Sequence, residues 1–233
     1  LICVPLTQQR TRELNLEQMA SENTDAKETA FTISVDSINT TTGISTFDRT
    51  TTILALVDNS TKPRELRRPG HVFPLRSENG GVLKRAGHTE AAVDLAKLAG
   101  LKAAGVICEV LNENGTMARL GDLEKFASKH GLRVISIAQL IDYRLRTEKL
   151  VERAASATLP TKYGEFTIYV YRNSVDNSEH VALVKGEWEE DEPVLVRVHS
   201  SCVTGDILSS SRCDCGPQHH SAMEAIGKEK GML

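Results

Sequence analysis

The order of apolar and polar positions predicts strands that alternate with helices through the first part of the chain. Apolar and polar side chains alternate from Phe31 to Ile38, as they do in a half-buried strand. Alanines and a leucine recur at helical spacing from Thr89 to Ala99, which predicts a helix with these side chains buried. Apolar residues from Gly105 to Leu111 predict another strand, and the series continues with a helix at Asp122 to His130 and a strand at Arg133 to Ile137. This alternation is typical of an α/β (α+β) domain with a layered, mixed sheet.

The segment from Lys62 to Gly87 breaks this alternation. It contains three prolines and four glycines, and its apolar residues follow neither the helical nor the strand period. It is therefore predicted to be a long loop, and loops of this length in a compact domain are usually functional. The segment also carries most of the basic residues of this region, among them Arg67, Arg68, His71, Arg76, Lys84 and Arg85.

A second, strand-led domain is predicted after a shift in composition near Arg146. A charged stretch with helical character, Arg146 to Ala154, leads into strands at Phe166 to Arg172, Glu179 to Lys185 and Pro193 to Ser201. The expected domains are therefore residues 1–146 and residues 147–233. The chain opens on an apolar run at Leu1, and its last helix, Ala222 to Lys230, leaves too few residues to complete a second core. Both ends are thus expected to continue in a longer protein, and the second domain is expected to be incomplete.

Composition and charge narrow the functional classes. The 233 residues carry a net charge of −3 and are 4% aromatic, which disfavours nucleic-acid binding because neither a broad basic face nor stacking side chains are supplied. No apolar stretch approaches the length of a membrane span, so a soluble protein without a membrane partner is expected. Five cysteines without the spacing of a disulfide framework indicate a reducing compartment.

The first candidate site is the hexapeptide Arg85-Ala86-Gly87-His88-Thr89-Glu90, where a loop enters a helix. Exposed amides and the helix dipole favour an anion there, Arg85 adds a positive fork, and His88 is free to reach a metal or a substrate oxygen. The alternative is that Thr89 only caps the helix and His88 is a surface residue. Glu109 interrupts an apolar strand, so it is expected to be paired, to bind a ligand or to lie at the end of the strand.

The second candidate site is the cysteine pattern C-x10-C-x-C, formed by Cys202, Cys213 and Cys215. Three thiolates with an open fourth position are the arrangement of a catalytic zinc, whereas His219 or His220 as the fourth ligand would make a closed structural site. The spacing alone leaves both possibilities open. On the preceding strand, Arg197, His199 and Ser201 share one face, which suits either a ligand pocket or the solvated side of an edge strand.

Several long motifs of the first domain resemble 3,4-dihydroxy-2-butanone 4-phosphate synthase. They are TTGIS with the following Asp48-Arg49, RPGHVFPL, GGVLKRAGHTEAAVDLAKLAG and AGVICEVLNENGTMARL. The resemblance implies conversion of ribulose 5-phosphate into 3,4-dihydroxy-2-butanone 4-phosphate and formate, with Mg²⁺ or Mn²⁺ as the cofactor. It also implies a homodimer with active sites at the subunit interface.

The same resemblance assigns roles to single residues. His71 and Glu109 match the two residues essential for proton transfer, and His88 matches the histidine that binds the divalent metal. The substrate-binding positions implied are Arg85, Ala86, Gly87, His88, Thr89 and Glu109, and further pocket residues are Cys3, Thr41 and Thr42. The glutamate-rich segment that supplies the other metal ligand in this family has no counterpart in the sequence.

The stretch RVHSSCVTGDILSSSRCDCGPQ, Arg197 to Gln218, resembles the start of GTP cyclohydrolase II. The resemblance implies that Cys202, Cys213 and Cys215 bind Zn²⁺, and that GTP is opened with release of formate and pyrophosphate. The implied GTP contacts are Arg197, Val198, His199, Ser200 and Gln218. Ser201 stands where this family usually has glutamate, and the remaining GTP contacts would follow Leu233.

Two functions of different classes follow from these observations. The first is a bifunctional enzyme of riboflavin biosynthesis, expected in the cytoplasm, or in a plastid for a plant protein. The second is a non-catalytic metal-binding or assembly module that has kept the fold, which Ser201 favours. Intact His71, His88 and Glu109 favour the enzyme.

Overall fold

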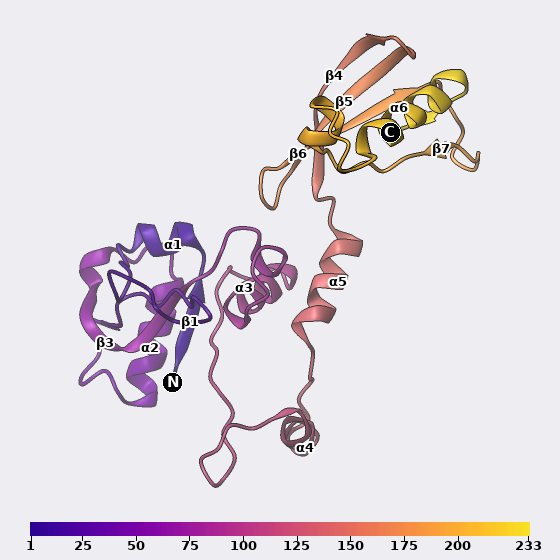
Figure 1. Cartoon of the computed structure of the whole chain (residues 1–233). Helices are drawn as coiled ribbons and strands as arrows, with labels where there is room; N and C mark the ends of the chain where they lie inside the picture. The colour runs from indigo at the N-terminus through magenta and orange to yellow at the C-terminus, as the bar shows by residue number, and fades with distance from the viewer. The chain divides into compact units, whose positions relative to one another are not determined.

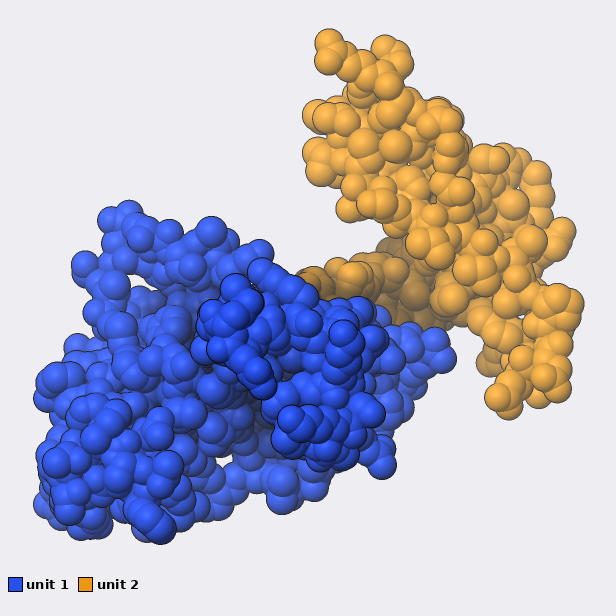
Figure 2. All heavy atoms as spheres, turned by 90° about the horizontal axis from the view of Figure 1, so that it is seen from below, with its two compact units in different colours: residues 1–148 blue, residues 149–233 orange.

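The computed structural model describes all residues from 1 to 233, and they form two compact units, residues 1–148 and 149–233 (Figures 1 and 2). Each unit has its own sheet and its own apolar core. None of the helices has the length and apolar character that crossing a membrane requires.

The first unit is built on a three-stranded mixed sheet in the order β1-β3-β2. Its central strand β3, Leu66–Arg76, is parallel to β1, Cys3–Leu6, and antiparallel to β2, Val35–Ser37. The helices and short turns of this unit are α1 (Gln8–Glu13), α2 (Thr46–Val57), η1 (Pro63–Glu65), η2 (Gly81–Leu83), α3 (His88–Leu98), α4 (Leu120–His130) and α5 (Ile137–Thr147). The core contains Val4, Leu6, Leu14, Leu16, Val35, Leu56, Leu66 and Val72.

The second unit is a five-stranded sheet in the order β4-β5-β6-β8-β7, with helix α6, Cys215–Lys228, packed against it (Figure 1). The strands are β4 (Val151–Thr161), β5 (Gly164–Asn173), β6 (Glu179–Lys185), β7 (Leu195–Val196) and β8 (Gly231–Met232), and η3 (Val203–Ile207) is a single π-helical turn. The core is small, since only Phe166, Met223 and Ile226 are fully buried in it. Helix α6 is thus the element that covers this sheet.

The prediction of a loop from Lys62 to Gly87 is wrong, because 11 of these residues form the central strand β3. Prolines are tolerated in it where ladder bonds are not needed. Pro69 lies at the irregularity of pairing with β2, and the carbonyl of Pro74 accepts from the N–H of Thr32. The functional residues of this segment therefore stand on a rigid element.

Two other predicted strands are absent. Residues 105–111 make only isolated bridges to neighbouring segments, such as Cys3 with Ile107, and Val106 is 52% exposed. Residues 133–136 have no regular structure, and Ile137 already begins α5. Both strands were predicted from apolar residues alone. Residues 105–107 do lie beside β1, but they form only isolated bridges with it and not a continuous ladder.

Four of the other predicted helices and strands are confirmed, and two further predictions are corrected. Helices α3 and α4 and strands β5 and β6 lie where the pattern placed them. The predicted helical stretch from Arg146 to Ala154 is wrong, because α5 ends at Thr147 and β4 begins at Val151. The predicted buried face of α3 is also wrong, because Leu95 is 41% exposed whereas Glu90 and Asp94 are buried. Both buried carboxylates are paired with arginines, which offsets part of the cost of burying them.

Candidate functional site

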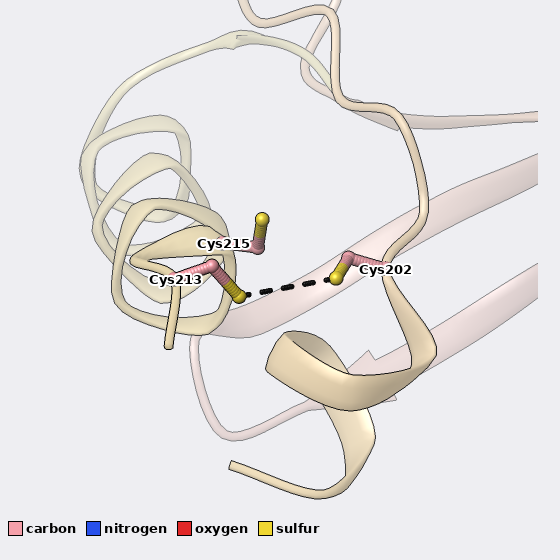
Figure 3. A group of neighbouring side chains, drawn as sticks. All are labelled: Cys202, Cys213 and Cys215. Carbon is pink, nitrogen blue, oxygen red and sulfur yellow. Dashed lines mark hydrogen bonds between the residues drawn. The ribbon is translucent and has the colours of Figure 1, made fainter. Parts of the chain in front are cut away.

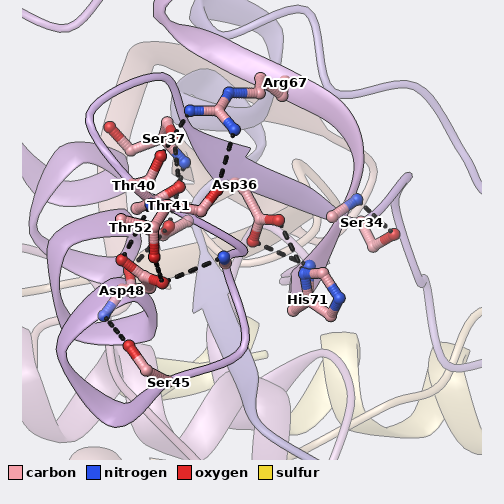
Figure 4. Close-up of polar contacts among 12 residues, drawn as sticks. Ser34, Asp36, Ser37, Thr40, Thr41, Ser45, Asp48, Thr52, Arg67 and His71 are labelled. Carbon is pink, nitrogen blue, oxygen red and sulfur yellow. Dashed lines mark hydrogen bonds and ion pairs between the residues drawn. The ribbon is translucent and has the colours of Figure 1, made fainter.

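His71 of β3 lies in direct contact with Asp36 of β2 (Figure 4). The ring Nδ1 of His71 is 2.7 Å from Asp36 Oδ2, and the backbone N–H of His71 donates to Asp36 Oδ1 at 2.9 Å. A register shift between Val35 and Asp36 in the β2–β3 pairing accompanies this placement of the carboxylate. The Asp36 residue is 5% exposed and the His71 side chain 43% exposed, so the pair reaches from the core to the surface.

The loop from Thr41 to Ser45 covers this pair and is fastened by Asp48 (Figure 4). Asp48 accepts hydrogen bonds from the hydroxyl and the N–H of Thr41, at 2.8 and 3.1 Å, and from the N–H of Gly43 at 3.1 Å. The Thr41 hydroxyl, followed by these N–H groups, holds the pKa of Asp48 below its usual value. Gly43 has φ +87°, and a Cβ there would overlap the Asp36 carboxylate and come within 2.7 Å of His71 Nδ1. Glycine is therefore required at position 43, because any side chain there would collide with Asp36.

The hexapeptide from Arg85 to Glu90 forms the start of α3. Gly87 is the N-cap and has no side-chain capping bond, so the first-turn amides of the helix remain available to a ligand. Thr89 lies inside the helix and is buried, so the prediction that it only caps the helix is wrong. His88, the first helical residue, is exposed, and no hydrogen bond or ion pair engages its ring.

Arg85 is already held in place by protein groups. Its guanidinium donates to Glu90 Oε2 at 2.7 Å and to the carbonyl of Lys27 at 2.8 Å. Glu90 is 1% exposed, and its other oxygen accepts the N–H of Glu78 at 2.9 Å. The helix amides beside this paired arginine remain free, and free amides at a helix N-terminus attract an anion such as a phosphate.

Glu109 does not lie in a buried strand, contrary to the expectation from sequence. Its side chain is 53% exposed, and its carboxylate lies 3.2 Å from the amino group of Leu1. The hydrogen bond from its own backbone N–H lowers the pKa of Glu109. The neighbouring Ile107 pairs with Cys3 at the start of β1, so Glu109 lies near that strand. No hydrogen bond or ion pair joins His71, His88 and Glu109 to one another.

The three cysteines of the second unit converge (Figure 3). Their sulfur atoms all lie within 4.8 Å of one another, and Cys202 Sγ is 3.9 Å from Cys213 Sγ. Zn–S bonds of about 2.3 Å in a tetrahedron place sulfurs about 3.8 Å apart, so this set fits zinc. The turn η3 follows Cys202 directly, and Cys215 is the first residue of α6.

The thiols differ in acidity because they are crowded together. Hydrogen bonds from the Thr204 hydroxyl and the Gly205 N–H lower the pKa of Cys202 to about 7. Its thiol neighbours Cys213 and Cys202 raise the pKa of Cys215 to about 11. One thiolate therefore forms readily, whereas three together need a cation.

His219 and His220 are not part of this sulfur group. His219 instead packs against His199 with ring centroids 5.1 Å apart, and burial lowers the pKa of His219. The group of converging side chains therefore contains three thiols and neither histidine, which fits a three-thiolate zinc site better than a Cys₃His site.

The strand predicted from Pro193 to Ser201 is limited to β7, Leu195–Val196, so Arg197 and His199 follow the strand and do not share a strand face. Their side chains connect to the segments that carry the cysteines. Asp206 Oδ2 accepts the backbone N–H of Cys202 at 2.7 Å and lies 2.9 Å from Nε2 of His199. Arg197 donates to Gln218 Oε1 at 2.6 Å. Val198, at 87% exposed, and Ser200 make no such bond.

Sequence reasoning missed Asp36 and Asp206, and it named Asp48 and Glu90 only as members of motifs, without the contacts that they make. The signal for the first was an acid among apolar strand residues, and Asp206 follows Cys202 at a spacing of four.

Comparison with protein families decides the identity of the first unit. Residues 1–143 match the model of 3,4-dihydroxy-2-butanone 4-phosphate synthase. The chain belongs to this family. Residues 152–233 match the model of GTP cyclohydrolase II, so a synthase-family region is followed by a second enzyme family in one chain.

The chain is also similar, over its full length, to longer riboflavin biosynthesis proteins. The chain is 57% identical over 237 residues to riboflavin biosynthesis protein RibBA of Aquifex aeolicus (strain VF5), and it covers 58% of that protein. It is 55% identical over 234 residues to RibBA of Bacillus cereus (strain ATCC 14579), covering 59% of it. The chain, matched over its full length, thus spans somewhat less than three fifths of these relatives.

Solved structures confirm the mixed α/β fold of the synthase family and the sheet-led second unit. RibBX, a two domain 3,4-dihydroxy-2-butanone 4-phosphate synthase from A. baumannii, has a TM-score of 0.76 and 45% identity, covering 93% of this chain and 64% of that one. A 3,4-dihydroxy-2-butanone 4-phosphate synthase in complex with two magnesium ions has a TM-score of 0.58 and 42% identity, covering 63% of this chain and 74% of that one.

Proposed function

We propose that the protein acts in riboflavin biosynthesis, and that its first unit converts D-ribulose 5-phosphate into 3,4-dihydroxy-2-butanone 4-phosphate and formate. The observation that carries this proposal is the family membership of residues 1–143 together with the intact His71, His88 and Glu109. We propose that the functional domains are residues 1–146 and 147–233, which is close to the division into compact units.

The catalytic and binding roles proposed in the first unit are assigned to groups that are free to contact a substrate. Loss of a carbon-bound proton next to the ketone, loss of water, a carbon-skeleton shift and release of formate all require acid–base groups, for which His71 and Glu109 are proposed. His71 can act because its Nε2 has no protein partner and its side chain is 43% exposed. The substrate phosphate is assigned to the helix amides beside the fixed Arg85, so that Arg85, Ala86, Gly87, His88 and Thr89 form the substrate-binding segment.

A divalent metal, Mg²⁺ or Mn²⁺, is proposed as the cofactor of this unit, with His88 as one ligand. The exposed, unpartnered ring of His88 is available for this. No other His, Cys, Asp or Glu joins it in a group that could hold an ion, and these metals need several oxygen ligands. His88 is therefore the metal ligand proposed in this chain, and the other ligands of the divalent metal are not assigned to residues of this chain.

The second unit is proposed to be the zinc- and GTP-binding start of a GTP cyclohydrolase II domain, an activity that opens the guanine ring and releases formate and pyrophosphate. Cys202, Cys213 and Cys215 would hold Zn²⁺, whose chemistry is Lewis-acid activation at an open fourth position. Arg197, Val198, His199, Ser200 and Gln218 are proposed as the GTP contacts. The bonds of Arg197 to Gln218 and of His199 to Asp206 support this, because they hold both side chains close to the cysteine segments.

We propose a homodimer in the cytoplasm. Apolar side chains of Leu101, Val106 and Leu111 are 69, 52 and 59% exposed, which supports a covering partner for this segment. The five free thiols support a reducing compartment. Light scattering of the purified protein would test the assembly, and a monomer at every concentration would contradict it.

Formate release tests the proposed function. The full-length protein should release formate from ribulose 5-phosphate, and His88→Ala should abolish this while the fold is retained. Unchanged turnover in that variant would refute the assignment of the site. Absence of turnover in a folded, metal-supplied protein would instead favour a non-catalytic module, the alternative that Ser201 suggests.

A further inference from the structure

Both oxygens of the buried Asp36 carboxylate are directed at a single residue, His71. Oδ1 accepts the backbone N–H and Oδ2 contacts ring Nδ1, and the carboxylate makes no other hydrogen bond. The similarly buried Asp94 instead divides its contacts between two residues, the N–H of Val82 and the guanidinium of Arg144. Asp36 acts on His71 alone.

We propose that Asp36 is a positioning residue that fixes His71 with its proton on Nδ1, so that Nε2 is the nitrogen that exchanges protons with the substrate. This inference rests on the proposed role of His71 in proton transfer. Nothing in the family match assigns a role to Asp36; the two hydrogen bonds carry it.

The tautomer follows from the donors and acceptors. An ionised carboxylate only accepts hydrogen bonds, so the contact of 2.7 Å requires that Nδ1 of His71 carry a proton. The second bond, from the backbone N–H of the same residue, holds the carboxylate in place, so a ring that turned away would lose its contact with Oδ2. Nε2 is left as the acceptor, on the exposed end of the side chain.

The surroundings keep this contact free of competing groups. Asp36 is 5% exposed, so water has little access to its oxygens. Gly43, at φ +87°, brings the loop backbone against both Asp36 and Nδ1 of His71. Asp48 holds that loop through the N–H groups of Thr41 and Gly43. The glycine, the loop and Asp48 thus support one histidine orientation.

The substitution Asp36→Asn gives an unambiguous expectation. The backbone N–H of His71 can only donate, so the amide oxygen of the new side chain must face it. The amide NH₂ then faces Nδ1 and forces this nitrogen to accept, which moves the ring proton to Nε2. In that tautomer Nε2 can no longer take a proton from the substrate.

The test is nitrogen NMR on the 233-residue chain labelled with ¹⁵N-histidine, in alkaline buffer where imidazole is neutral. The chain has seven histidines, and the spectrum of His71→Gln identifies the signal of His71. We expect the Nδ1–H form in the native chain and the Nε2–H form in Asp36→Asn. The matched control is Asp94→Asn, a carboxylate of similar burial, 4% against 5%, that touches no histidine and should leave the His71 signal unchanged.

An Nε2–H form or a mixture in the native chain would overturn the inference, and this result does not depend on whether Asp36→Asn folds. An unchanged tautomer in a folded Asp36→Asn would overturn it as well. In the full-length protein, kcat for formate release should fall about 10²-fold or more in Asp36→Asn, with KM changed little. If His71→Gln retains full turnover, the proposed role of His71 fails, whereas the tautomer measurement still decides the positioning.

Discussion

The small core of residues 149–233 makes Phe166→Ala the most informative stability variant. Phe166 is 1% exposed and packs with Met223 and Ile226, the only other fully buried members of this core. Removing a buried phenylalanine costs about 3–5 kcal/mol, out of about 5–15 kcal/mol for a whole domain. For a domain of this size each kcal/mol lowers the Tm by about 4–8 °C. The unfolding transition of the second unit should therefore fall by more than about 10 °C or disappear.

Differential scanning calorimetry of the full chain measures this. The matched control is Leu56→Ala, which removes a side chain with 0% exposure from the core of the first unit at a cost of about 2–5 kcal/mol. Phe166→Ala should move only one transition and Leu56→Ala only the other. If both variants shift a single common transition, the two units unfold together, and the reasoning from separate cores is refuted.

Three further predictions concern the sites. Asp206→Asn should weaken zinc binding about 10–100-fold, because the Asp206 carboxylate accepts the backbone N–H of the zinc-ligand candidate Cys202. Competition with a chromophoric chelator measures this affinity, and an unchanged affinity would contradict the role of Asp206. Gly43→Ala should destabilise the chain to chemical denaturant by more than Gly115→Ala. Both glycines have a positive φ, which costs an alanine about 1–2 kcal/mol, but only a Cβ at Gly43 would meet neighbouring atoms. Equal losses of stability would contradict the close packing around Gly43. Because the pKa of Asp48 is lowered, the stability that its carboxylate contributes is complete above the ordinary value of 3.8 and is lost as the pH falls through the lowered pKa. Asp48→Asn should therefore lose less stability than the native chain on acidification below about pH 4. An identical acid profile in the two proteins would contradict this.

Much of the fold follows from local patterns in the sequence. Helix α4 ends at Gly131, which adopts φ +63°, and β6 spans the residues that alternation placed there. The convergence of three cysteines also follows, because Cys213 and Cys215 are close in sequence and Cys202 precedes a tight turn.

The rest depends on contacts between distant segments. Strand β3 was hidden because its prolines and glycines read as loop signals, whereas pairing with β1 and β2 makes it the central strand. The buried face of α3 was misjudged because Arg85 and Arg144 neutralise Glu90 and Asp94. The Asp36–His71 contact joins residues 35 positions apart, a distance over which periodicity carries no information.

The central claim is tested most directly by the products formed from ribulose 5-phosphate by the full-length protein supplied with Mg²⁺. The account predicts formate and 3,4-dihydroxy-2-butanone 4-phosphate in equal amounts, and neither product with His71→Gln. A folded, metal-supplied protein that leaves ribulose 5-phosphate unchanged would contradict it.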